Sequence, residues 1–241
     1  MNLSKDLNFQ LSADPLNPKL DGVMVGIVTN NKDPDGLARV KLKLPLREVE
    51  AETDWVRMTT LMGGKEMGSL FIPEVGDEVL VAFHLGEMRQ PFVIGMLWSK
   101  KQPAPKGNDK NDIRKFKSRA GHEIIFDDND SKGLVTVKTK KGQIIELADE
   151  KDTIKIAEQS GSNEIMIKGG SANEISVTSG SSTITINSKG EITINSPKSL
   201  TIKSAQINIE ASATLAIKAG ASLDLKSDGM INIKGSMVKI N

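Results

Sequence analysis

The sequence predicts an all-β chain in two parts, a small N-terminal barrel followed by a β-helix that three copies of the chain wind together. Three observations support this prediction. Short segments of β-branched residues, separated by turn residues, fill residues 21–98. Pairs of aliphatic residues then recur at short intervals as far as Val238 and Ile240. Aromatic residues are confined to the first part, because none follows Phe126.

The composition excludes several classes of function. The 32 basic and 31 acidic residues leave a net charge of +1, which does not favour general binding to nucleic acid or anionic lipid. The chain has no cysteine, so disulfides and thiolate metal sites are excluded. No apolar run has the length of a signal peptide or of the roughly 20 residues that span a membrane. The sequence therefore predicts a protein that is soluble when made and that leaves the cytoplasm, if it does, without a cleaved signal peptide.

The first part reads as an N-terminal arm (1–20), a barrel (21–98) and a Lys- and Pro-rich linker (99–118). The barrel strands expected from the pattern are Val23–Thr29, Ala38–Leu44, Asp54–Thr60, Glu78–His84 and Phe92–Leu97. Five short strands with turn-rich breaks and little helix signal predict a Greek-key barrel of the OB type.

The second part, residues 119–241, repeats one unit: two aliphatic residues flanking a single other residue, then a corner of Gly, Ser, Asn, Asp or Lys. Alternation with period two is typical of a strand with one buried face. The spacing between pairs shortens from about ten residues to about eight along the chain. The residues expected in the core of the β-helix are Ile154, Ile156, Ile165, Ile167, Ile175, Val177, Ile184, Ile186, Ile192, Ile194, Leu200, Ile202, Ile207, Ile209, Leu215, Ile217, Leu223, Leu225, Ile231 and Ile233.

Three arrangements of these strands are open. Antiparallel hairpins are disfavoured because the corners lack regular Asn-Gly or Asp-Gly pairs. A β-helix wound by one chain would have to close a core from only two inward residues per strand. Three chains wound together bring three such strips to one axis, so an intertwined homotrimer is preferred.

The barrel resembles the OB domain of phage baseplate spikes and of VgrG proteins of type VI secretion. The motifs that carry the resemblance, in order, are Asp33-Pro34 with Gly36 and Arg39-Val40, then Trp55-Val56-Arg57, Pro73-Glu74 with Gly76-Asp77-Glu78-Val79, Pro91 with Val93 and Gly95, and the segment RAGHEIIFDD at 119–128.

The resemblance implies the central spike of a contractile injection system, which pierces a target membrane mechanically and is not an enzyme. It implies a protein made in the bacterial cytoplasm without a signal peptide, assembled into a phage-tail-like particle or secretion apparatus and delivered to the target envelope. It implies a trimer with a baseplate hub protein at the OB end. It also implies a cone-shaped PAAR-type tip protein at the C-terminal end, seated on Met237, Val238, Ile240 and Asn241. The alternative is a β-helix adhesin or a polysaccharide-binding tail-spike protein.

Two departures from the family pattern stand out. Full-length VgrG proteins have a large hub region before the OB domain, whereas only about 20 residues precede it here, so the chain is either a stand-alone spike or a fragment. Some phage spikes also contain a lysozyme domain between barrel and helix, and the linker at 99–118 is too short to hold one.

No catalytic, cofactor or metal site is predicted. His84 and His122 stand alone, and the glycines around Lys65 lack phosphate-loop spacing. The acids Asp127, Asp128 and Asp130 lack the further ligands of a calcium loop. Nucleic-acid binding is not predicted, because the aromatic residues of the barrel sit in or beside apolar runs, as core residues do: Trp55, Phe71, Phe83, Phe92 and Trp98.

Overall fold

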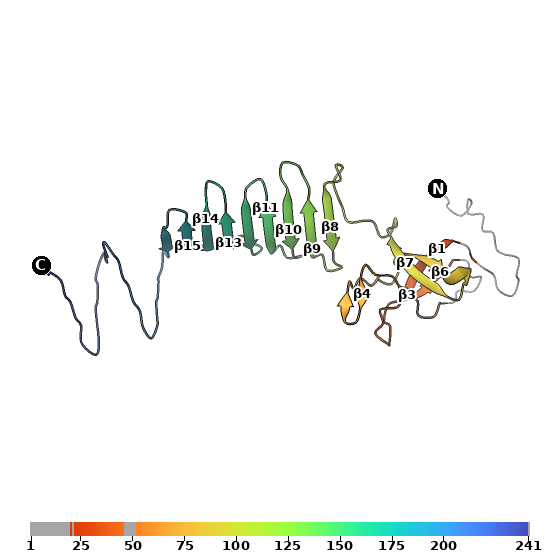
Figure 1. Cartoon of the computed structure of the whole chain (residues 1–241), viewed down its shortest axis with the longest axis horizontal. Helices are drawn as coiled ribbons and strands as arrows, with labels where there is room; N and C mark the ends of the chain where they lie inside the picture. The colour runs from red at the N-terminus through yellow and green to blue at the C-terminus, as the bar shows by residue number, and fades with distance from the viewer. Residues whose placement is uncertain (1–19, 21, 46–51, 241) are drawn as a thin grey trace.

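The structure, a computed structural model, describes residues 20, 22–45 and 52–240. Of the predicted N-terminal arm, only Leu20 lies within the described residues. The chain is all-β, as predicted, with a barrel-like collar at one end, a long row of strands beside it and an extended tail (Figure 1). We refer to residues 22–98 as the collar, to β8–β16 as the shaft sheet and to residues 196–240 as the tail.

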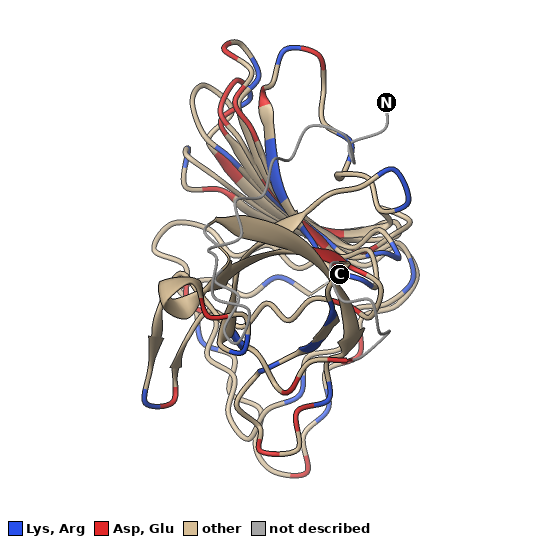
Figure 2. Ribbon diagram, turned by 90° about the vertical axis from the view of Figure 1, so that its right-hand side faces the viewer, with Lys and Arg blue, Asp and Glu red and all other residues tan. Residues whose placement is uncertain are grey.

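The collar is built on a five-stranded sheet in the order β2-β1-β6-β7-β3. Neighbouring strands are antiparallel except for the parallel pair β3 and β7. The sheet curls into an open half-barrel (Figure 2). Each of the five predicted barrel strands has a counterpart among β1 (Val23–Asn30), β2 (Lys41–Lys43), β3 (Arg57–Met58), β6 (Glu78–Phe83) and β7 (Pro91–Leu97). A separate hairpin consists of β4 (Gly63–Gly64) and β5 (Met67–Gly68), and a short 3-10 turn, η1 (His84–Gly86), follows β6.

The collar core follows from alternation along the strands. On β6 the side chains of Val79, Val81 and Phe83 point inward and are buried, while the residues between them are half-exposed. They pack with buried residues of β1 and β2, among them Val28 and Leu42. The collar therefore has a hydrophobic core of its own.

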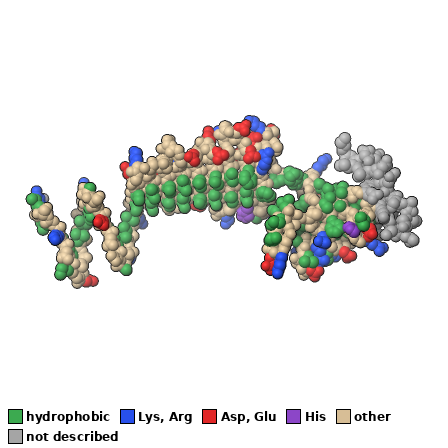
Figure 3. Space-filling view, in the orientation of Figure 1, with side chains coloured by type: hydrophobic (Ala, Val, Ile, Leu, Met, Phe, Trp, Pro, Cys, Tyr) green, Lys and Arg blue, Asp and Glu red, His purple; other side chains and the backbone are tan. Residues whose placement is uncertain are grey.

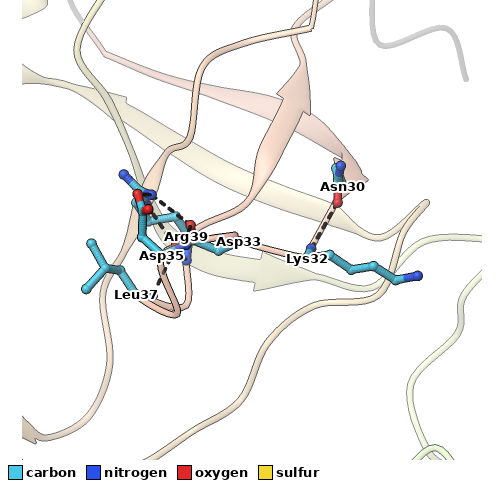
Figure 4. A network of polar contacts seen from close by, with 6 residues as sticks. All are labelled: Asn30, Lys32, Asp33, Asp35, Leu37 and Arg39. Atoms are coloured by element: carbon cyan, nitrogen blue, oxygen red, sulfur yellow. Dashed lines mark hydrogen bonds and ion pairs between the residues drawn. The ribbon is translucent and has the colours of Figure 1, made fainter.

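One loop of the collar is fixed by a carboxylate, as Figure 4 shows. Asp33 accepts hydrogen bonds from Nε of Arg39 at 2.8 Å and from its terminal nitrogen at 2.7 Å. The same carboxylate accepts the backbone N–H groups of Asp35, Leu37 and Arg39. These hydrogen bonds, those from the Arg39 side chain above all, hold the pKa of Asp33 well below its usual range. The Asp33–Arg39 motif of the sequence thus fixes the turn between β1 and β2.

The shaft sheet has nine antiparallel strands, each paired with its neighbours in sequence. They are β8 (Ile113–Lys117), β9 (Glu123–Asp127), β10 (Leu134–Lys138), β11 (Ile144–Ala148), β12 (Thr153–Ala157), β13 (Asn163–Lys168), β14 (Glu174–Ser179), β15 (Ser182–Asn187) and β16 (Ile192–Asn195). The hairpin arrangement that the sequence disfavoured is therefore the one observed over these residues, and the expectation of continuous winding was wrong here. The sheet begins with β8, inside the segment expected to be a linker.

The hairpin corners explain why antiparallel pairing of these strands was not predicted from the sequence. They close without regular Asn-Gly pairs, through glycines with positive φ such as Gly142 (φ 95°) and Gly161 (φ 73°). At the β12–β13 corner, Glu158 accepts backbone N–H groups of Ser160 at 2.7 Å and Ser162 at 3.0 Å. Hydrogen bonds from the side chain and backbone of Ser160 lower the pKa of Glu158 to about 2.

The tail forms no strand pairing within the described part of the chain. It runs in long extended segments with sharp reversals (Figure 1). Its residues are exposed except Ser196, which is half-buried.

Candidate assembly surface

The aliphatic pairs of the sequence lie on one face of the shaft sheet. Cross-strand register places the members of each pair opposite members of the next pair, so the side chains form two continuous columns. We call these columns the apolar strip. One column consists of Phe126, Val135, Leu147, Ile154, Ile167, Ile175, Ile186 and Ile192, and the other of Ile124, Val137, Ile145, Ile156, Ile165, Val177, Ile184 and Ile194.

The apolar strip is open to solvent in the single chain. Its residues are substantially exposed, from 36% at Val135 to 68% at Ile192. Figure 3 shows the strip as continuous rows of hydrophobic side chains along the shaft sheet. Contiguous exposed apolar surfaces of this extent mark a site of interaction with another molecule.

The opposite face of the shaft sheet is suited to water. Cross-strand ion pairs join Lys117 to Glu123 at 2.8 Å, Lys155 to Glu164 at 3.0 Å, and Lys168 to Glu174 at 2.9 Å. Threonine and serine occupy other positions of this face, for example Thr185 and Ser176. Opposite charges across neighbouring strands favour this pairing. This face also holds Ile125, Leu134 and Ile144 in β9–β11 and is polar in β14–β16, whereas the face of the apolar strip lacks a cover.

The tail continues the same alternation without a sheet to support it. Its paired residues are exposed, from 51% at Ile207 to 91% at Ile240. In the described part of the chain, backbone–backbone hydrogen bonds end with the β15–β16 ladder. Peptide groups that become buried need hydrogen-bond partners. An extended strand with an apolar face has such partners available only in another strand.

The predicted core residues divide between these two surfaces. Those from Ile154 to Ile194 lie in the apolar strip, and those from Leu200 to Ile233 lie on the tail. Of the predicted tip-binding residues, Met237, Val238 and Ile240 are exposed at the end of the tail, and Asn241 lies outside the described residues. Their burial by other chains stays a prediction.

Sequence reasoning placed two exposed aromatic residues in the core of the barrel. It also left residues at the start of the apolar strip out of the predicted core. Phe71 and Trp98, interpreted as core residues, are 59% and 75% exposed. Phe116, Ile124 and Phe126 were not among the predicted core residues, although Phe116 lies opposite Ile124 at the start of the strip. Their alternation in IRKFK and EIIFD was a usable signal.

Three of the isolated polar residues considered in the sequence have local structural partners. His122 accepts the backbone N–H of Lys140 through Nδ1 at 3.3 Å. Asp128 pairs with Arg114, and Asp127 accepts the backbone N–H of Asn129 at 3.2 Å. Among the described residues, no group of three or more His, Cys, Asp or Glu side chains could hold a metal ion. No helix within the described ranges is long and apolar enough to cross a membrane.

Comparison with known families identifies the collar. Residues 24–98 match the family described as the type VI secretion system/phage-baseplate injector OB domain. The match confirms the resemblance seen in the sequence and the OB assignment of the half-barrel.

Curated relatives agree with this family. The chain is 31% identical over 96 residues to type VI secretion system spike protein VgrG3 of Vibrio cholerae, a match that covers 36% of this chain and 9% of the relative. It is 32% identical over 105 residues to spike protein VgrG5 of Pseudomonas aeruginosa, covering 40% and 13%. Spike protein VgrG1b of the same organism is 28% identical over 107 residues, covering 41% and 14%. The match thus spans only a small part of each relative's length.

Proposed function

We propose that three copies of this chain form the central spike of a contractile injection system, a phage-tail baseplate or a type VI-like apparatus. In this assembly the three apolar strips face one axis, and the polar faces of the three shaft sheets face water. The spike acts mechanically, piercing a target envelope, and not as an enzyme.

The uncovered apolar strip is the observation that carries this proposal. Two columns of side chains cannot enclose a core within one flat sheet, because every side chain of the strip keeps one side open. Three sheets arranged as a triangular prism cover one another's strips completely. Burying this aliphatic surface is strongly favourable, at about 25 cal/mol for each Å² removed from water.

The tail supports the same assembly. Its peptide groups form no backbone–backbone hydrogen bonds in the described part of the chain, and its paired residues keep the strand alternation of the shaft sheet. Tails from three chains that wind around one another give each strand neighbours on both sides and bury the aliphatic pairs at the axis. The intertwined β-helix predicted from the sequence thus belongs to the tail, whereas β8–β16 form one face of the prism from a single chain.

The mechanical role follows from this construction. Nine strands about 4.8 Å apart give the shaft sheet a length on the order of 40 Å. Backbone hydrogen bonds run along the whole of that length, and the wound tails cannot separate without unwinding. Such an object unfolds slowly, so its resistance to force is kinetic.

The partners of the proposed spike lie at its two ends. A baseplate hub protein binds at the collar end, as the family match of residues 24–98 and the spike names of the relatives suggest. A PAAR-type tip protein sits on the last strands of the tail, near Met237, Val238 and Ile240, where edge groups and apolar side chains are exposed. The β-helix adhesin is disfavoured, because sugar-binding surfaces normally use aromatic platforms and no aromatic residue follows Phe126.

The molecular mass in solution tests the proposal. Light scattering of the full chain is expected to give three times 26.0 kDa, and the particle should resist heat and SDS. A monomer that retains β structure would overturn the proposal, because a single chain leaves the strip in water.

A further inference from the structure

The shaft sheet has an open pocket at its collar end, on the face opposite the apolar strip. Register places Lys117, Glu123 and Lys138 side by side on β8, β9 and β10. They alternate with residues of the strip such as Ile124 and Val137, so they lie on the other face. Together with the corners that follow β8 and β10 they enclose a hollow of about 420 Å³, which we call the basic pocket. Its lining includes Lys117, Arg119, Gly121, Glu123, Lys138 and Lys140.

Positive charge dominates the basic pocket. Its one lining carboxylate, Glu123, is already paired, because Nζ of Lys117 lies 2.8 Å from it. The hydrogen bond from Lys117 above all, with the charges of Lys115 and Lys138 adding to it, lowers the pKa of Glu123 from its usual value. Four cationic side chains and one anionic side chain line the pocket, so three positive charges remain. This local excess contrasts with the net charge of +1 for the whole chain.

The chain itself does not neutralise these charges. Among the described residues, no carboxylate lies within ion-pair distance of Lys138 or Lys140. Arg119 bonds to both carboxylate oxygens of Glu74, at 3.0 and 3.2 Å. The side chains of that pair are 81% and 47% exposed, so water competes with the contact and the guanidinium is able to exchange it for another anion.

Hydrogen bonds hold the two corners of the pocket together. In the first corner the Gly121 N–H donates to the Ser118 carbonyl oxygen, and the Ser118 N–H donates to the His122 carbonyl oxygen, both at 2.9 Å. Nδ1 of His122 then accepts the backbone N–H of Lys140 in the second corner, at 3.3 Å. Gly121 has a φ of 90°, a conformation that favours glycine, and the stem of the Lys140 side chain lies against it. The backbone beneath the cationic side chains is therefore fixed before any ligand binds.

An anion with oxygen atoms on several sides suits this arrangement. Cationic side chains reach the pocket from β8, from β10 and from both corners, so they surround a ligand instead of meeting it along one edge. A tetrahedral phosphate accepts hydrogen bonds from several directions, and the planar fork of an arginine binds two of its oxygen atoms at once. The hollow is larger than a single phosphate, so the phosphate can be part of a larger headgroup.

We infer that the basic pocket binds a phosphate group, carried either by a lipid headgroup or by a soluble phosphate compound. The inference does not require the proposed spike, because every lining residue belongs to one chain. In the proposed spike the pocket faces outward, since the apolar strip on the opposite face turns toward the axis. Each copy then presents one phosphate site beside the collar.

Calorimetric titration of the full chain with inorganic pyrophosphate tests the pocket, with acetate at equal ionic strength as the reference anion. Pyrophosphate is expected to bind and acetate is not. Replacing both unpaired lysines, Lys138→Gln with Lys140→Gln, should weaken the binding by about tenfold or more, because each loses a charge-assisted hydrogen bond. The matched control is Lys151→Gln with Lys189→Gln, which removes the same charge from exposed turns elsewhere in the sheet and should leave binding unchanged.

Vesicles distinguish the two sources of the phosphate. Cosedimentation of the chain with vesicles of phosphatidylcholine and phosphatidic acid, but not of phosphatidylcholine alone, supports a lipid headgroup. Binding of pyrophosphate without cosedimentation supports a soluble phosphate compound. Absence of pyrophosphate binding, or equal weakening by both pairs of substitutions, overturns the inference.

Light scattering of the same samples keeps the inference separate from the spike. A trimer that does not bind pyrophosphate removes the phosphate site and leaves the spike, whereas a monomer that binds it removes the spike and leaves the site. Loss of the trimer in the chain with Lys138→Gln and Lys140→Gln, while the control chain stays trimeric, would assign these lysines to a contact between chains. That result would also overturn the inference.

Discussion

Ile156 of β12 lies directly opposite Ile165 of β13, and both side chains remain more than 40% exposed, at 45% and 41%. Paired β-branched residues on neighbouring strands normally meet in a core. Here the pair is correctly registered and uncovered, and the same holds along the whole sheet. The predictions that follow depend on what covers this surface.

Replacing Val177 with Asp should abolish the trimer, whereas replacing its neighbour Ser176 with Asp should not. Val177 belongs to the apolar strip, and Ser176 points to the opposite, polar face of β14. Three uncompensated carboxylates near one axis would cost on the order of several kcal/mol per chain. Sedimentation of both variants measures the result. Trimers from both would mean that the strip does not face the axis.

The tail offers an independent pair of substitutions. Ile231→Asp should remove the resistance to heat and SDS, while Asn232→Asp should retain it, because alternation places the two side chains on opposite faces of one extended segment. Electrophoresis with and without heating compares them. Equal resistance would show that the tail does not bury its aliphatic pairs.

Deleting residues 234–241 should leave the trimer intact and remove binding of a PAAR-type tip protein. The shaft sheet and most of the tail remain available for assembly, whereas the exposed Met237 and Val238 are lost. Light scattering and pull-down of the tip protein measure the two properties separately. Capture by the truncated spike would place the tip protein elsewhere.

Asp33→Asn should lower the melting temperature of the collar at neutral pH and change its dependence on acid. The pKa of Asp33 is depressed from 3.8, chiefly by the Arg39 hydrogen bonds, so the unfolded chain binds the proton first as the pH falls. The stabilisation is therefore present above about pH 4 and is lost at more acidic pH. Thermal unfolding of both chains from pH 7 to pH 2 should show the largest difference at neutral pH and a shrinking one below pH 4. Parallel curves would assign no such role to Asp33.

Much of the fold could be predicted because alternation alone specifies a face. The two columns containing Ile154 and Ile156 were identified from period two and β-branching, and register then follows from the corners. The barrel strands were found from short runs of β-branched residues between turn residues, and on β6 the buried Val79 and Val81 alternate with half-exposed residues.

The arrangement of the strands could not be predicted from the same signal. A hairpin and a continuously wound strand both place alternate residues on one face, so the pair Ile175 and Val177 is compatible with either. Only the corner decides, and corners such as Thr139–Gly142 close with a glycine at positive φ instead of an Asn-Gly pair. The exposure of Phe71 could not be predicted either. The sequence shows that an aromatic side chain favours burial, but not whether its own chain or another chain buries it.

The change from hairpins to an unpaired tail also sets an order of events for assembly. In the shaft sheet every strand finds its neighbours within its own chain, so each copy can form β8–β16 alone. The tail has no such neighbours, so in the proposed trimer the three tails come close to one another only after the three sheets have joined through their strips. Winding of the three tails in the proposed trimer therefore starts beside β16 and advances away from the collar, towards residue 240. A defect in the strip should stop the tail from forming, whereas a defect late in the tail should leave the strip assembled.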